Sequence, residues 1–214
     1  MSKVLCVGVA SLDTIVLVEK YPAADERVIA LDTMRAAGGP AMTAAVTLAR
    51  LGVDASLSCV VGDDEAGRFI FDVLKREGID TKNVIVDPTI ATAMGTIVVS
   101  KSEETRAIMA RPHNTLPAKP TNISDYPWIH FDHFGVRAMK NWGISRSQGR
   151  KISLDIGYPV AGVSAGDFDL YVPSEKITTD TATAVRDKNM VVVSRGRQGS
   201  VFNDGTSSGV VPAI

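Results

Sequence analysis

The sequence predicts an α/β fold in which buried strands alternate with helices. Lys3 to Val9 is an unbroken apolar run, which is typical of a central strand covered on both faces. Pro40 opens a stretch of small and apolar residues that favours a buried helix, because proline suits the first helical turn. Ala55 to Val61 then alternates as a strand, so the strand–helix rhythm continues. The 214 residues, 45% of them hydrophobic, are enough for one core with a small appendage.

Two stretches interrupt this rhythm with strands alone. Thr14 to Val18 and Arg27 to Met34 flank the turn-rich sequence YPAADE, and Thr96 to Ser100 and Thr105 to Met109 flank the polar turn KSEE. Alternating segments around short polar turns are typical of hairpins. We expect these strands to pair as a separate β flap over the ends of the main sheet.

The remaining elements continue the α/β alternation. Asp64 is placed as the N-cap of a helix that ends at Gly78. Further buried strands are predicted over 128–134, 151–156, 169–172 and 190–194, and residues 199–203 read as a strand that enters a hairpin turn at Asp204-Gly205. Ligands of open α/β sheets bind beyond the carboxyl ends of the strands, where Asp13, Asp132 and Asp155 are expected.

A glycine pair precedes the predicted first helix. Gly38 and Gly39 permit a tight turn, while Thr43, Thr47 and Arg50 form one narrow polar stripe on the helix. An abrupt helix start exposes backbone N–H groups, which suit an anion or a set of hydroxyls. The same residues also fit a plain turn that packs a helix onto the sheet.

Composition excludes several classes of partner. Lys plus Arg total 23 and Asp plus Glu 24, without a long run of one sign, so neither nucleic acid nor an acidic membrane surface is an expected partner. The N-terminus lacks the pattern of a signal peptide, and no stretch is long enough to span a bilayer. Cys6 and Cys59 lie in apolar runs, which predicts reduced core thiols in a cytoplasmic protein.

Several ordered motifs resemble one family. The segments VLCVGVASLD, EKYPAADE, GGPAMTAAVTLARLG, GDDEAG, NTLP and WIHFDHF resemble the PfkB family of ATP-dependent sugar kinases, with LCVG and WIH most similar to ketohexokinase-type fructose kinases. The resemblance runs from about residue 3 to about residue 205.

This resemblance implies a fold and an activity. The fold is a ribokinase-like three-layer α/β/α sandwich, with residues 1–214 as one domain and lid strands inserted at about 14–34 and 94–111. The activity is transfer of the γ-phosphoryl group of ATP, with Mg²⁺, to a hydroxyl of a ketose-like sugar. The resemblance also implies a homodimer formed through the lid.

Five positions are carried over to the sugar site. Asp13 matches an acid that accepts hydrogen bonds from sugar hydroxyls, although a strand-end cap is the alternative. The Gly38-Gly39 turn lines the site, and Thr43 stands where most of the family has Asn, which leaves the identity of the sugar open. Asp132 matches an acidic position near the sugar, or is a buried structural acid.

Five more positions are carried over to the phosphate side. Arg106 matches an arginine that offsets charge on the transferred phosphoryl group, or is a solvated strand-edge charge. Ser194, Gly196 and Gly199, in SRGRQGS, match a stretch that approaches the nucleotide phosphates. Glu175 is placed near magnesium through water, although the Asn that accompanies it in the family is absent.

Five other polar residues have an undecided role. Arg27, Arg111 and His113 lie on or beside the flap, where they could meet an anionic sugar or be scattered surface charge. His130 and His133 are interpreted as strand histidines with hydrogen-bond partners.

The resemblance also implies a segment that these residues do not contain. A Gly-Ala-Gly-Asp loop, which supplies the general base, is expected after a segment like GVVPAI, and KITTDTATAVRDKNM is short for the helix expected there. We expect either a part of a longer active kinase or a catalytically inactive sugar- or nucleotide-binding remnant without turnover. A nucleoside kinase is a further alternative, although Tyr21 is the sole aromatic residue of the flap segments.

Overall fold

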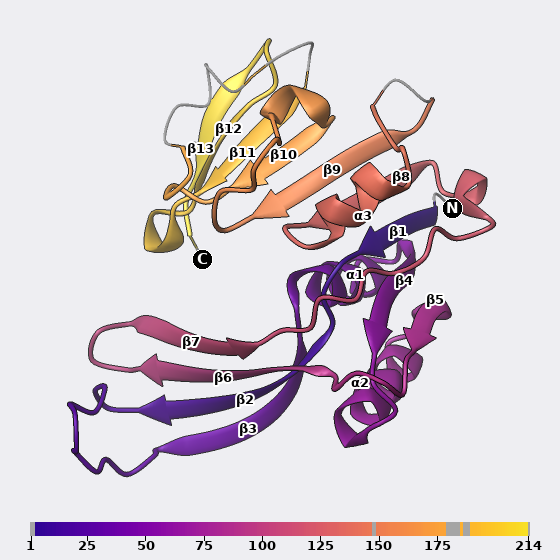
Figure 1. Cartoon of the computed structure of the whole chain (residues 1–214). Helices are drawn as coiled ribbons and strands as arrows, with labels where there is room; N and C mark the ends of the chain where they lie inside the picture. Colours follow the sequence, from indigo (N-terminus) through magenta and orange to yellow (C-terminus); the bar gives the residue numbers. More distant parts are fainter. Residues whose placement is uncertain (1–2, 147–148, 179–184, 186–188, 214) are drawn as a thin grey trace.

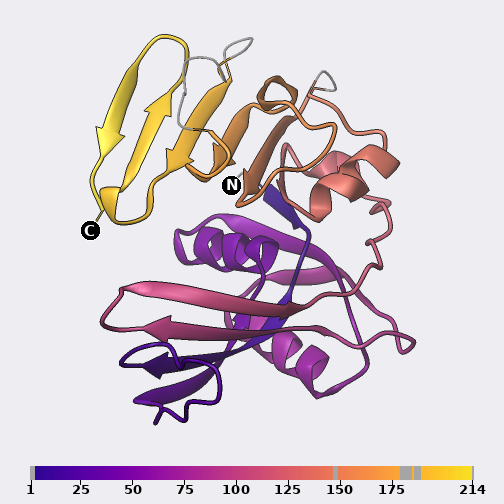
Figure 2. The same cartoon turned by 60° about the vertical axis from the view of Figure 1, so that its left-hand side comes forward.

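Two β-sheets organise the molecule (Figure 1). The computed structural model describes residues 3–146, 149–178, 185 and 189–213. The strand order is β13-β12-β11-β10-β9-β8-β1-β4-β5 in the nine-stranded sheet and β3-β2-β6-β7 in the four-stranded sheet. The smaller sheet projects from the side of the larger one in both views (Figure 2).

The large sheet is parallel over most of its width. Its central strand β1 (Lys3–Val7) pairs in parallel with β4 (Asp54–Val61) and β8 (Trp128–Asp132). The other parallel strands are β5 (Asp80–Val86), β9 (Lys151–Ile156), β10 (Leu170–Pro173) and β11 (Met190–Ser194). One edge is an antiparallel pair, β12 (Ser200–Asn203) and β13 (Ser208–Val211), so the predicted hairpin after 199–203 is confirmed.

Helices cover both faces of this sheet. Leu5 and Val7 share a buried cluster with α3 (Gly135–Asn141), whereas Val4 and Cys6 share one with α1 (Pro40–Arg50) and α2 (Glu65–Arg76). Successive side chains of a strand point to opposite faces, so the predicted α/β sandwich is confirmed. The short helices η1 (Ile123–Asp125), η2 (Ala165–Asp167) and η3 (Gly196–Gln198) lie in connections.

The four-stranded sheet, called the lid below, consists of β2 (Ser11–Val18), β3 (Asp32–Gly38), β6 (Ala93–Ser100) and β7 (Thr105–Arg111). β3 differs from the predicted strand Arg27 to Met34 because its pairing with β2 runs from Leu17↔Asp32 to Ser11↔Gly38. β2 begins at Ser11 rather than Thr14 for the same reason. The lid strands therefore reach back to the glycine pair.

The polar stripe predicted on the first helix is also confirmed. Thr43, Thr47 and Arg50 are exposed on α1. Most of the KITTDTATAVRDKNM stretch lies outside the described residues. Within the described ranges, no helix is long and apolar enough to cross a membrane.

Candidate functional site

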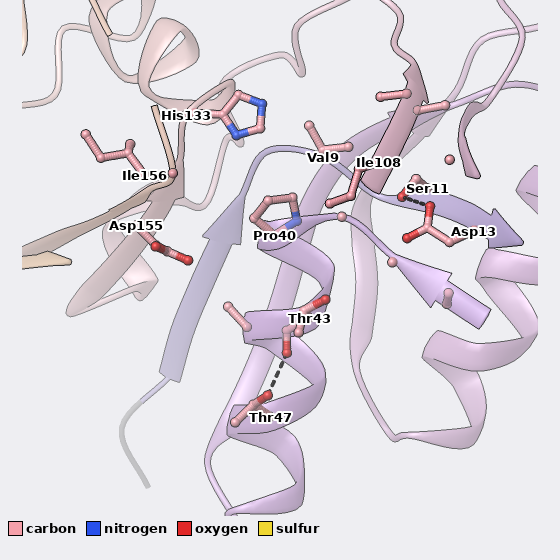
Figure 3. A pocket seen from close by; sticks show the side chains of 18 of the residues that line it. Val9, Ser11, Asp13, Pro40, Thr43, Thr47, Ile108, His133, Asp155 and Ile156 are labelled. Atoms are coloured by element: carbon pink, nitrogen blue, oxygen red, sulfur yellow. Dashed lines mark hydrogen bonds between the residues drawn. The ribbon is translucent and has the colours of Figure 1, made fainter. Parts of the chain in front are cut away.

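A cavity of about 1400 Å³ lies between the lid, α1 and strands β8 to β11 of the large sheet; Figure 3 shows the part between the lid, α1 and Asp155 of β9. This volume exceeds the roughly 300–1,000 Å³ of a site for one small ligand. Six residues that the sequence placed in a site line its wall: Asp13, Gly38, Gly39, Thr43, Arg106 and Ser194.

Asp13 presents a carboxylate to this cavity. The sequence placed it at the end of the first strand, but the structure places it within β2 of the lid, opposite Ala36 of β3 and Gly95 of β6. Its Oδ1 accepts a hydrogen bond from Ser11 Oγ at 2.9 Å, drawn in Figure 3. The half-buried carboxylate keeps acceptor capacity toward the cavity, since an ionised carboxylate offers about four lone-pair sites.

Glycines make room for this carboxylate. A Cβ atom on Gly38 would collide with Asp13 Oδ2, and one on Gly95 would lie 2.6 Å from Oδ1. Gly39 has φ +90°, and a Cβ there would collide with the carbonyl oxygen of Val9. The missing side chains thus allow Gly38 to lie against Asp13 and Gly39 to lie against the backbone of Val9, where the chain enters the lid. Gly95 escaped the sequence reasoning, although an isolated glycine within a strand is a signal for close approach.

The start of α1 differs from the open N-terminus considered above. The Ala41 amide donates to Asp132 Oδ2 at 3.3 Å, and the Met42 amide donates to the carbonyl oxygen of Val9 at 3.2 Å. Pro40 carries no N–H group. The first donors of α1 are therefore engaged by the protein itself, which corrects the hypothesis that they await an anion.

Asp132 is a structural acid rather than a sugar contact. It is fully buried and is absent from the described residues that line the cavity. Besides Ala41, its carboxylate accepts from the amides of Val9 at 2.7 Å, Phe134 at 2.9 Å and Gly135 at 2.7 Å. The prediction of a sugar contact is wrong because backbone donors from the loop after β1, from α1 and from the start of α3 saturate the carboxylate.

Asp155 on β9 faces the cavity beside this buried acid. The two residues are paired in register across β8 and β9, and Asp155 lines the wall in Figure 3. Partial loss of hydration and the nearby Asp132 carboxylate raise the pKa of Asp155, while His133 opposes the shift. The His133 ring lies 4.6 Å from that of Tyr158, and both also line the cavity.

His130 is held inside the sheet as a neutral side chain. Burial lowers its pKa to about 4. Its Nδ1 lies 2.9 Å from Ser153 Oγ, which also accepts a hydrogen bond from Trp128 Nε1 at 2.8 Å. The interpretation as a satisfied strand histidine fits this network.

The basic residues of the lid region separate into two groups. Arg106 and Arg111 are exposed and line the cavity, and Arg111 donates to the carbonyl oxygen of Thr92 at 3.2 Å. Among the described lining residues, neither Arg27 nor His113 occurs. His113 instead places Nε2 2.9 Å from the carbonyl oxygen of Val60. Two of these four basic residues therefore line the cavity, near opposite ends of β7.

The Ser194 end of the cavity carries a tight glycine turn. Gly196 and Gly199 have φ of +55° and +80°, and the Arg195 amide donates to the Gly199 carbonyl oxygen at 2.8 Å. The described lining residues include Ser194 but neither of these glycines. Glu175 is exposed and is likewise absent from them, although its amide donates to the Ser194 carbonyl oxygen. Across the described part of the chain, no cluster of three potential metal-ligating side chains occurs.

Comparison with known proteins identifies the family. The family described as pfkB family carbohydrate kinase matches residues 1–139. The chain belongs to this family. The match contains the lid, the glycine pair and both Asp13 and Asp132, so the site geometry above is that of a pfkB family member.

Individual relatives agree with this assignment. Ribokinase of Bacillus subtilis is 31% identical over 109 residues, which is 51% of this chain and 36% of that protein. Fructokinase of Klebsiella pneumoniae is 34% identical over 99 residues, 44% of this chain and 32% of that protein. These alignments span about a third of the curated relatives.

A solved structure shows the same fold. Ribokinase from Cryptococcus neoformans, in a complex with ADP, superposes with a TM-score of 0.76 at 16% identity and covers 100% of this chain and 79% of its own. This protein therefore has the ribokinase-like fold along its whole aligned length.

Proposed function

We propose that the protein is an ATP-dependent kinase that transfers the γ-phosphoryl group to a hydroxyl of a ketose-like sugar. The observation that carries the proposal is the Asp13 carboxylate, which faces a large cavity in a pfkB family member with one oxygen bonded to Ser11 alone. An ionised carboxylate accepts hydrogen bonds only, so it suits neighbouring hydroxyl donors. Thr43 lines the same wall and adds a hydroxyl at the start of α1.

The phosphate side rests on Arg106 and on the 194–199 turn. Arg106 reaches the cavity from β7, where its fixed positive charge would offset charge on a transferring phosphoryl group. Gly196 has φ +55° and open space beside it, so the backbone of the turn is accessible there, whereas the chain at 211–213 packs against Gly199. We place the ATP phosphates beside Ser194.

Two carboxylates are candidates for holding magnesium. Bound Mg²⁺ would neutralise charge on the ATP phosphates, and it is usually held by those phosphates, waters and one or two carboxylates. The exposed Glu175 side chain lies outside the described cavity lining, so this carboxylate fits the role only through intervening water. Asp155 lines the cavity and is the better placed acid.

The proton acceptor for the sugar hydroxyl is not assigned to a residue. A catalytically inactive sugar- or nucleotide-binding protein is the second candidate, and Thr43, which stands where most of the family has Asn, favours it. A nucleoside kinase is the third candidate: the flap residue Tyr21 lies outside the described cavity lining, with Oη 3.0 Å from Thr105 Oγ1, while the aromatic residues Trp128 and Tyr158 line the cavity.

We further propose a homodimer through the lid in the cytoplasm. Met34, Ile15, Ile97 and Ile108 form one row across all four lid strands, and Met34 and Ile108 are 54% and 55% exposed. Ile15, Ile97 and Ile108 also line the cavity, so the interface would lie on the cavity-facing side of the lid. Exposed apolar rows of this kind mark interaction surfaces. Ile108→Asp should lower the mass measured by light scattering, whereas Met109→Asp, on the other face of β7, should not. Equal masses for both variants would contradict the lid dimer.

A substrate screen tests the kinase itself. Purified protein of verified intact mass would be assayed for ADP release with ATP, Mg²⁺ and D-fructose, D-ribose or adenosine, and for binding of the same compounds by calorimetry. ADP release that depends on a sugar supports the kinase. Sugar binding without ADP release supports the inactive alternative, adenosine as the preferred acceptor supports the nucleoside kinase, and neither binding nor release overturns all three.

A further inference from the structure

We propose that Gly95, on lid strand β6, is a positioning residue for the acceptor: with Gly38 and Ser11 it fixes the orientation of the Asp13 carboxylate. The inference rests on the proposed function for what Asp13 binds. It does not rest on the identity of the sugar, because Gly95, Gly38 and Ser11 orient Asp13 before any ligand binds.

Two of the three residues that hold the Asp13 carboxylate, Gly38 and Gly95, come from the two strands that flank β2. Asp13 pairs with Ala36 on β3 and with Gly95 on β6. Its carboxylate lies diagonally across β2, because Oδ2 occupies the space a Cβ of Gly38 would need, and Oδ1 lies 2.6 Å from the place of a Gly95 Cβ. Real Cβ atoms are essentially never found this close to another heavy atom. Any side chain at Gly95 must therefore displace the carboxylate or strand β6.

Ser11 sets which oxygen is held. Its hydroxyl is buried and donates to Asp13 Oδ1 at 2.9 Å, the oxygen that faces Gly95. A methyl group at Gly95 would press on the oxygen that Ser11 binds, so rotation of the carboxylate would also break this bond. The orientation of Asp13 thus depends on one hydroxyl and on two missing side chains.

Strand β6 is poorly able to retreat, because its start is fixed to the core. Thr92, just before the strand, donates to Asp64 through its amide at 2.9 Å and its hydroxyl at 2.6 Å. The Gly62 amide donates to the same hydroxyl at 2.8 Å, and Arg111 donates to the Thr92 carbonyl oxygen at 3.2 Å. Asp64 is also the N-cap of α2. The GDDEAG motif therefore anchors the strand that carries Gly95.

Movement should consequently fall on the carboxylate. In Gly95→Ala we expect Asp13 to rotate away from Ser11 and to lose the geometry in which it meets two neighbouring hydroxyls. Binding of D-fructose should weaken by about tenfold or more, the range for losing one hydrogen bond to a charged group. ATP affinity should change by less than about twofold, since Ser194 is the last residue of β11 in the large sheet, apart from the lid strand that carries Gly95 (Figure 1).

The experiment is a double-mutant cycle read by calorimetry. Wild type, Gly95→Ala, Asp13→Asn and the double variant are titrated with D-fructose and with ATP. Gly157→Ala is the control for a methyl group added to the cavity wall away from Asp13: Gly157 also lines the cavity, a Cβ there meets nothing within 4 Å, and its φ lies outside the left-handed region. We expect Gly95→Ala to weaken D-fructose binding beside Asp13 and to have no further effect in the Asp13→Asn background. Equal losses in both backgrounds, or no loss, would overturn the proposal.

A crystal structure of Gly95→Ala separates this inference from the proposed function. If Asp13 is displaced and its hydrogen bond to Ser11 is broken, the positioning role of Gly95 is supported. This holds even if the wild type binds no sugar; in that case the proposed sugar kinase fails and the role of Gly95 does not. Asp13 in its original place would overturn the role of Gly95 whatever the binding data show.

Discussion

Two aspartates, Asp13 in the lid and Asp132 at the end of a core strand, both pack closely against glycines but have different roles. Asp13 and Asp132 each lie against glycine backbone, with Gly38 and Gly95 beside the first and Gly8 beside the second. Asp132 accepts from four amides and is fully buried, whereas Asp13 accepts from one hydroxyl and faces the cavity. The partner groups, not the close fit, separate a structural carboxylate from one available to a ligand.

Removal of the Asp132 carboxylate should have the largest effect on stability. Asp132→Ala leaves four backbone N–H groups without their acceptor: one in the loop after β1, one on α1 and two at the start of α3. We expect the free energy of unfolding to fall by about 3–5 kcal/mol, because each unsatisfied buried donor is costly. Urea denaturation followed by circular dichroism measures this. A loss no greater than that of Asp13→Ala would mean that the four amides find water instead.

Gly8→Ala should reproduce part of this loss without touching the acid itself. Gly8 has φ +151°, and an added Cβ would collide with the Asp132 carboxylate. We expect a loss of about 2–3 kcal/mol in the free energy of unfolding, since both backbone strain and displacement of a buried acid contribute. Combining Gly8→Ala with Asp132→Ala should cost less than the sum of the two. Full additivity would show that Gly8 acts through something other than Asp132.

Asp13→Asn should show the reverse pattern. The substitution keeps the size of the side chain while adding an NH₂ group where an acceptor stood. The free energy of unfolding should stay within about 0.5 kcal/mol of wild type, while D-fructose binding weakens by about tenfold or more. Chemical denaturation and calorimetry on the same preparation provide both values. A stability loss like that of Asp132→Ala would erase the distinction between the two acids.

The sequence alone could identify both aspartates as candidates, but it could not show which one is structural and which one faces the cavity. The apolar run of β1 and the Gly-Gly-Pro start of α1 predicted the fold correctly, because those signals are local. The role of Asp132 depends on amides 123 and 91 residues away in sequence, Val9 and Ala41, which no local pattern reveals. α3 was missed for a related reason: its N-cap, Phe134, makes no side-chain capping hydrogen bond.

The smallest effect concerns Asp155, the cavity acid paired in register with Asp132. Partial burial and the Asp132 carboxylate raise its pKa in the folded protein, so near neutral pH its ionised form is less favourable folded than unfolded. Asp155→Asn should raise the melting temperature there by about 1–2 °C. The gain should vanish at about pH 3, below the unfolded pKa, where both states are protonated.

Asp169→Asn provides a control of opposite sign for the same melting curves. Burial works against the charge of Asp169, but hydrogen bonds from the Ile152 amide, Lys151 and Arg146 outweigh it and lower the pKa. Stability from such a group is present above the unfolded pKa and is lost as the pH falls through the folded one. The substitution should therefore lower the melting temperature near neutral pH and lose its effect in acid. If both variants shifted the melting temperature in the same direction, neither lost hydration nor the Asp132 carboxylate would disfavour the charge of Asp155, and Asp155 would behave as an ordinary surface acid.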